Sequence, residues 1–202
     1  VGIIIKDYGS IFLIIALAQF SYIITAYFLL NNLKIKSALN NIKNMLPAAI
    51  SGFSTMSSAA SMPLIIMGAE NNAKNKDIIR SVVPASVNIH LIGDCFAIPI
   101  LAFAILKSFG MEEPSMLNYL IFTCYFILAK FSVAAIPGGG ILVMLPILEG
   151  YLGFTSDMMS LITALYILFD PVITCANVFA NGAFAKMIDR VISFGNKKKP
   201  MG

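Results

Sequence analysis

Hydrophobic residues occupy this chain in long blocks, and polar or helix-breaking residues interrupt most of the blocks near their centres. The exception is Tyr8–Leu30, which contains no charged residue and no proline. An apolar helix of about 20 residues is long enough to cross a bilayer. The pattern therefore predicts a spanning helix over 8–30, followed by a polar and basic cytoplasmic loop that extends to residue 44.

The second apolar block, 45–69, is long enough to cross a membrane, but its centre is polar. Residues 51–63 include five serines, a threonine, a glycine and a proline. Each arm beside this centre is too short to span a bilayer. Basic residues flank both ends of the block, and positive charge marks the cytoplasmic side of membrane proteins. The pattern predicts a first re-entrant hairpin, which enters and leaves the membrane on the cytoplasmic side.

The fourth block, 117–148, contains two apolar arms around Pro137-Gly138-Gly139-Gly140. Proline removes a backbone donor and glycine adds flexibility, so a helix that crosses lipid gains nothing from this sequence. Unpaired backbone groups in hydrocarbon cost several kcal/mol each unless they face protein, water or a solute. We interpret the block as a second re-entrant hairpin with its tip beside a binding site. The alternative is an ordinary loop between two membrane helices.

Two further blocks have the pattern of interrupted helices. Block 78–106 is interrupted at Pro84, at 88–94 and at Pro99, and block 158–195 is interrupted at Asp170-Pro171 and ends in a basic tail. The chain thus contains the same unit two times, a hairpin followed by a broken helix. Inverted repeats with interrupted helices are typical of secondary transporters, which bind substrates and ions near the interruptions.

The distribution of charge tests this topology. If the loops at 31–44 and 70–80 and the C-terminal tail are cytoplasmic, most of the 14 Lys and Arg residues lie inside. Loops 107–116 and 149–157, which carry Glu112, Glu113, Glu149 and Asp157, then lie outside. This arrangement requires both hairpins to be re-entrant, from opposite sides. The prediction is a multi-pass membrane protein, in a bacterial inner membrane, with a cytoplasmic C-terminus.

Composition supports the same class and excludes others. Hydrophobic residues make up 58% of the chain and charged residues 12%, whereas soluble domains carry about 25% charged residues. We therefore expect a single all-α integral membrane domain over 1–202. A single histidine and three cysteines without paired spacing indicate neither a metal centre nor a disulfide framework. No nucleophile–base pair indicates an enzyme, and topology explains the basic tail better than nucleic-acid binding does.

Both hairpin tips resemble those of a known family, the dicarboxylate/amino acid:cation symporters, or glutamate transporter homologues. The resemblance is carried by Ser57-Ser58-Ala59-Ala60-Ser61-Met62-Pro63 and by Ala135-Ile136-Pro137-Gly138-Gly139-Gly140. It covers nearly the whole chain, because 8–30 is similar to the family's sixth helix, 84–94 to its unwound seventh and 170–182 to its eighth. The resemblance implies sodium- or proton-coupled symport of amino acids or dicarboxylates by alternating access, with the hairpins as inner and outer gates.

The same resemblance implies the site residues. In the eighth helix, Asp170 would hold the substrate's amino group, Thr174 its side chain and Asn177 its carboxylate. The implied substrate-binding residues are Ser57, Ser58, Ser61, Pro137, Gly138, Gly139, Asp170, Thr174 and Asn177. The implied residues for ion or proton coupling are Asn88, His90, Asp94, Asn177 and Asn181, with sodium as the one metal ion to consider.

The chain also departs from the family's pattern. An arginine that grips a second carboxylate is replaced by Ile173, which removes bidentate recognition. We therefore expect a neutral or apolar substrate. Two aspartates of the sodium sites are replaced by Ile92 and Asn181, which predicts weaker sodium binding.

Two ionisable residues take new positions in the seventh-helix motif, which reads Asn-Met-Asp-Gly-Thr in the family and His90-Leu91-Ile92-Gly93-Asp94 here. Asp94 and His90 could restore charge locally or carry a proton. For His90, an alternative is that it only hydrogen-bonds backbone groups freed by the helix break.

Family members have an additional N-terminal half that forms the scaffold and the contacts of a homotrimer. This chain begins just before the sixth helix, so we expect it to hold the mobile transport part, with small-molecule substrate and membrane lipid as partners. The scaffold would then come from another polypeptide. The alternative function is a non-transporting remnant or an accessory membrane subunit.

Overall fold

Helices form almost all of the chain in the computed structural model, which describes residues 2–196 and the side chains of residues 8–194. Within that range there are eight helices and no strand, so the prediction of an all-α protein is confirmed. In chain order they are α1 (Gly2–Leu30), α2 (Ile35–Thr55), α3 (Met62–Glu70), α4 (Lys76–Ser86), α5 (Ile92–Ser108), α6 (Met116–Lys130), α7 (Gly139–Leu152) and α8 (Ser156–Asn196).

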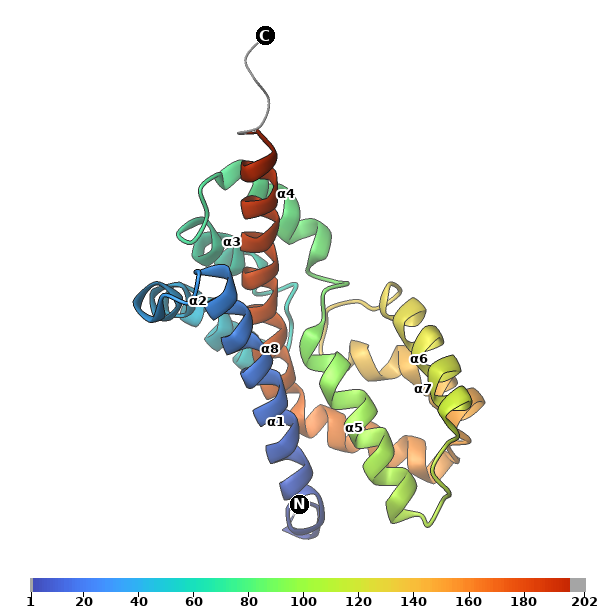
Figure 1. Cartoon of the computed structure of the whole chain (residues 1–202). Helices are drawn as coiled ribbons and strands as arrows, with labels where there is room; N and C mark the ends of the chain where they lie inside the picture. The colour runs from blue at the N-terminus through green and yellow to red at the C-terminus, as the bar shows by residue number, and fades with distance from the viewer. Residues whose placement is uncertain (1, 197–202) are drawn as a thin grey trace.

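Two helices are long and apolar enough to cross a membrane, α1 over Tyr8–Leu30 and α8 over Ser156–Phe194. Only 22% of the apolar window of α1 is buried inside the protein, so most of its apolar surface faces outward, as lipid contact requires. The Tyr27 hydroxyl of α1 donates to the Phe179 carbonyl of α8 at 3.0 Å. The two helices therefore pack side by side (Figure 1).

Helices α2 and α3 form a helical pair whose connection, 56–61, contains the predicted serine-rich tip. The pair begins earlier than the sequence predicts, because α2 starts at Ile35 inside the segment interpreted as a loop. The reason is a helical stripe of small or flexible residues that packs inward. Its buried members are Ala38, Asn41, Met45, Ala48, Ala49 and Gly52.

The break between α4 and α5 falls at 87–91, within the interruption that the sequence predicts. The predicted interruptions at Pro84 and Pro99 are wrong, because each proline lies inside a helix. A proline removes one intrahelical donor and bends a helix, but it ends the helix only when neighbouring residues also favour another conformation. Around 87–91 they do, since the polar Asn88 and His90 can bond elsewhere.

The second helical pair, α6 and α7, is joined by residues 131–138. Gly138 has φ +70° and directly precedes α7. A side chain at Gly139 would overlap the backbone carbonyl oxygen of Ala134. The glycines are therefore required where the chain turns back into α7, as the sequence predicts for this tip.

Helix α8 corrects another prediction, because it continues through Asp170-Pro171 without a break over 41 residues. In Figure 1 its orange N-terminal part runs obliquely and its red C-terminal part runs upright, so the helix bends instead of ending. A single proline is a common cause of such a bend. The continuity matters for the site, since Asp170, Thr174, Asn177 and Asn181 lie on successive turns of one helix.

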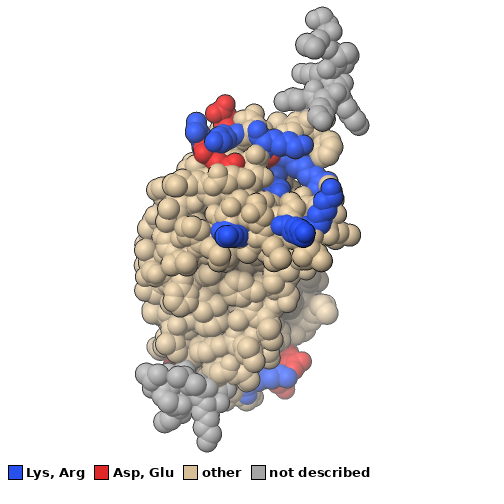
Figure 2. Space-filling model, turned by 90° about the vertical axis from the view of Figure 1, so that its left-hand side faces the viewer, with Lys and Arg blue, Asp and Glu red and all other residues tan. Residues whose placement is uncertain are grey.

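Buried apolar side chains form two clusters. One joins α5, α6 and α7 to the first part of α8, and the other joins α2, α3 and α4 to its second part. Each helical pair thus packs on its own part of α8. Figure 2 shows Lys and Arg gathered toward one end of the molecule, a wide belt without charge, and a smaller group of both signs at the other end.

Candidate substrate site

The tips of the two helical pairs meet at Ala135. Its carbonyl oxygen accepts hydrogen bonds from the Ser57 hydroxyl at 2.8 Å and from the Ala59 backbone N–H at 3.3 Å. Its own N–H donates to Oδ1 of Asn88, in the break between α4 and α5, at 3.1 Å. One residue of the second tip is therefore held by the first tip and by the broken helix.

Asp170 lies directly beneath the second tip and is only 3% exposed. Its carboxylate accepts hydrogen bonds from the backbone N–H of Gly138 and from the Thr174 hydroxyl, both at 2.9 Å. Among the described side chains, no basic group lies within 4.0 Å of it. A buried carboxylate without a cation is costly, so this group is suited to bind a cationic group from outside the protein.

Asp94 has an ionic partner instead. Nζ of Lys130, at the end of α6, lies 2.9 Å from Oδ2 of Asp94, and the two side chains are 6% and 2% exposed. The Tyr166 hydroxyl of α8 donates to the other carboxylate oxygen. The ion pair thus joins α6 to α5, and the tyrosine joins both to α8.

Two asparagines on α8 connect it to the broken helix. Oδ1 of Asn177 accepts from the backbone N–H of Gly93 at 2.7 Å. The fully buried Asn181 donates through Nδ2 to the carbonyls of His90 and Asn177, at 3.2 and 3.0 Å, and its Oδ1 accepts from Ser86. Nδ2 of Asn177 makes no hydrogen bond to the described residues, which leaves it available to a ligand.

The space between these groups is small. A cavity of about 10 Å³ lies between the tips and α8, close to the smallest volume that holds one water molecule. The predicted site residues that line it are Ser58, Asp94, Asp170, Thr174 and Asn177, and they are joined by Tyr166 and the backbone of the second tip. The structure therefore shows this site closed, with no room for an amino acid.

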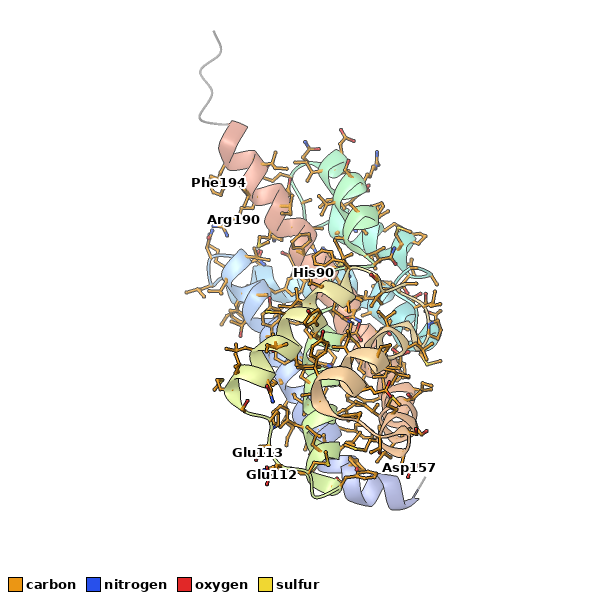
Figure 3. The ribbon with its side chains drawn as sticks, turned by 90° about the vertical axis from the view of Figure 1, so that its right-hand side faces the viewer. His90, Glu112, Glu113, Asp157, Arg190 and Phe194 are labelled. Carbon is orange, nitrogen blue, oxygen red and sulfur yellow. The ribbon has the colours of Figure 1, made fainter. Side chains whose placement is uncertain are left out.

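Other predicted site residues support the tips or lie elsewhere. The Ser61 hydroxyl donates to Ser51 at 3.0 Å within the first helical pair, and Pro137 is exposed. His90 lines a separate, mostly apolar cavity of about 220 Å³ between α1 and α8, where its ring stacks on Phe184 with centroids 4.5 Å apart. Figure 3 shows His90 between the level of Arg190 and that of the acidic loops.

Sequence reasoning missed Lys130 and Tyr166. Lys130 is the one charged residue between Leu117 and Leu148, and a charge inside an apolar membrane segment signals function. Tyr166 lies one helical turn before Asp170, on the same face of α8. Both signals were present in the sequence, but neither indicated a partner.

A helical protein with helices of membrane-spanning length, two interlocking tips and a buried carboxylate beneath one of them has the architecture of a transporter. The chain matches the Sodium:dicarboxylate symporter family over residues 2–191, and it belongs to this family. It is therefore related to symporters and not to enzymes. A Caenorhabditis elegans protein named as a sodium-dependent excitatory amino acid transporter, glt-4, is 25% identical over 157 residues, which are 77% of this chain and 31% of that protein. The chain thus spans about a third of that relative's length.

The family's name implies sodium and a dicarboxylate, and the residues of this chain fit neither well at the predicted positions. Ile92 offers no ligand, and Asn181 directs N–H groups, not oxygens, at two carbonyls. Ile173 is fully buried where the resemblance implies an arginine. None of the described residues that line the cavity is an arginine, which could provide the bidentate donor that a second carboxylate requires.

Proposed function

We propose that this chain is the substrate-binding part of a cation-coupled symporter that carries an amino acid with a single carboxylate. The helical pair α2–α3 would be the inner gate and the pair α6–α7 the outer gate, working by alternating access. The observation that carries this proposal is the buried Asp170 carboxylate, held between a gate tip and α8 without a cation. An ammonium group is its natural partner.

The remaining groups favour an amino acid over a simple amine. Nδ2 of Asn177 is free to donate to a carboxylate, and Ser58 of the first tip lines the same cavity. The Thr174 hydroxyl lies between Asp170 and Asn177 along α8, one turn from each. Because Ile173 supplies no charge, a substrate with a second carboxylate would leave that group unpaired at a cost of several kcal/mol.

Binding requires a gate to move, because the closed cavity is too small for a substrate. The second tip is held by a few hydrogen bonds, to Ser57, Ala59, Asn88 and Asp170, and by the Lys130–Asp94 pair. Such a small set of contacts can be exchanged during a gating motion. Sodium or a proton would be the coupling cation.

The distribution of charge supports the orientation. Glu112, Glu113 and Asp157 lie at one end of the molecule and Arg190 at the other (Figure 3). The positive-inside rule places the Arg190 end in the cytoplasm. Both gates are then re-entrant, from opposite sides, and the C-terminus is cytoplasmic in a multi-pass protein.

The test is uptake of radiolabelled serine, alanine and aspartate into proteoliposomes that contain the full chain, under a sodium gradient or a proton gradient. Asp170→Asn should abolish uptake and weaken binding by at least about tenfold, because a charge-assisted hydrogen bond is lost. Asp157→Asn, an exposed aspartate on the same helix, is the matched control and should transport normally. Equal activity of the two variants would refute the role of Asp170. Absence of any uptake would favour an accessory subunit.

A further inference from the structure

Lys130, which forms an ion pair with Asp94 in the site, is a charged residue that neither substrate binding nor the family resemblance explains. Both side chains are almost fully buried, in a protein whose surroundings are apolar. Charged residues inside a membrane segment occur where they pair with one another or serve function. The partners come from separate elements, Lys130 from the outer-gate pair and Asp94 from the helix beneath it. Opening this gate must therefore separate two charges.

At Asn181, a side-chain amide of the protein also occupies a position that a cation could take. The carbonyl oxygens of His90 and Asn177 converge on Nδ2 of Asn181. Converging oxygens are what a hard cation prefers as ligands, and here an amide N–H group occupies that space. Among the described residues, both the Asp94 carboxylate and these converging carbonyls are thus occupied by side-chain nitrogens of the protein, whereas Asp170 is not.

We propose that Lys130 is a resident cation of the site. Its ammonium group neutralises Asp94 and holds the outer gate closed, so closure of this gate proceeds without a bound sodium ion. The inference rests on the proposed function only in treating α6–α7 as a gate. The inference gives Lys130 a specific role. Its positive charge is part of the gate and, unlike a bound sodium ion, cannot dissociate from it.

The experiment measures hydrogen–deuterium exchange of the second tip, 131–138, in lipid nanodiscs without substrate. The wild-type protein should show equal protection in sodium chloride and in choline chloride. Lys130→Met leaves Asp94 unpaired, so its tip should exchange at least about tenfold faster in choline. Sodium, or protonation of Asp94 at low pH, should restore protection in this variant because either supplies the missing positive charge.

Three variants act as controls. Lys130→Arg retains the charge and should stay protected in choline. The double variant Asp94→Asn with Lys130→Met removes both charges and should be protected and insensitive to sodium. Lys107→Met removes an exposed lysine, which pairs with Glu113 at 3.0 Å, and should behave as wild type. If Lys130→Met does not fold, two measurements still test the proposal: wild-type protection in sodium chloride against choline chloride, and the response of the double variant to sodium.

Three outcomes would overturn the proposal. The first is a wild-type tip that is several-fold better protected in sodium than in choline. The second is Lys130→Met exchanging as slowly as wild type in choline. The third is fast exchange in that variant which neither sodium nor low pH slows. Because no substrate is present, a failure of transport would leave these results unaffected, so the two proposals fail separately.

Discussion

Gly93 is a residue at which a small change should affect both helix packing and the site. It is the second residue of α5, at the point where this helix meets α8. A methyl group at Gly93 would overlap the carbonyl oxygen of Ile173 and lie 3.0 Å from Oδ1 of Asn177. The backbone N–H of Gly93 also donates to that Oδ1 at 2.7 Å. Gly93→Ala must therefore push the two helices apart and strain this hydrogen bond.

The magnitude of this change follows from two destabilising effects and one that opposes them. Overpacking that forces a backbone shift costs about 1–3 kcal/mol, and weakening a buried hydrogen bond costs about 1–3 kcal/mol more. Replacing glycine lowers the entropy of the unfolded chain, which returns about 0.4–1 kcal/mol. We expect Gly93→Ala to lower the free energy of unfolding by about 1–5 kcal/mol and to weaken substrate binding through Asn177.

Thermal unfolding of the purified protein in detergent measures this change. The matched control is Gly150→Ala, because Gly150 lies within α7 and a methyl group there meets no atom within 4 Å. That variant should be unchanged or more stable by up to about 1 kcal/mol. If Gly93→Ala unfolds at the wild-type temperature, or if both variants lose the same stability, the argument that α5 and α8 require close contact at Gly93 is refuted.

Two further predictions concern contacts that hold α8 in place. Tyr27→Phe removes a fully buried hydroxyl that donates to Phe179, and it should lower the free energy of unfolding by about 1 kcal/mol; thermal unfolding measures this, with the exposed Tyr22→Phe as an unchanged control. Asp189→Ala removes the acceptor for the backbone N–H groups of Lys74 and Asn75, at 2.8 and 3.0 Å, and should cost about 1–3 kcal/mol and speed amide exchange of residues 71–76. Asp77→Ala, at an exposed aspartate, should leave that exchange unchanged.

The positions at which helices end could be predicted from the sequence wherever several residues favoured the same interruption. The serine-rich tip, the polar segment around Asn88 and the Pro-Gly-Gly-Gly tip all contain residues that either form hydrogen bonds outside a helix or adopt positive φ. Single prolines were a weaker signal. Pro84, Pro99 and Pro171 remain inside helices, because each removes one hydrogen bond and the packed neighbours keep the helix together.

The start of α2 shows a second limit. Its first turns carry Lys36 and polar side chains, which made the segment look like a solvated loop. The helix forms because its buried stripe includes small residues such as Ala38 and Gly52. A side chain at Gly52 would lie 2.7 Å from Val178 on α8. That stripe is recognisable only when its partner surface is known, and α8 lies more than a hundred residues away.

The choice of partner for Lys130 shows why the site itself could be predicted only in part. A lysine in an apolar segment requires a carboxylate nearby, and the sequence offers two buried candidates in the interrupted segments, Asp94 and Asp170. Periodicity cannot choose between them, because the pairing joins residues 36 positions apart on two different helices, α5 and α6. The structure pairs Lys130 with Asp94 and leaves Asp170 without a cation. On the proposals made above, that asymmetry would separate the two carboxylates into one that secures the gate and one that binds a substrate amine.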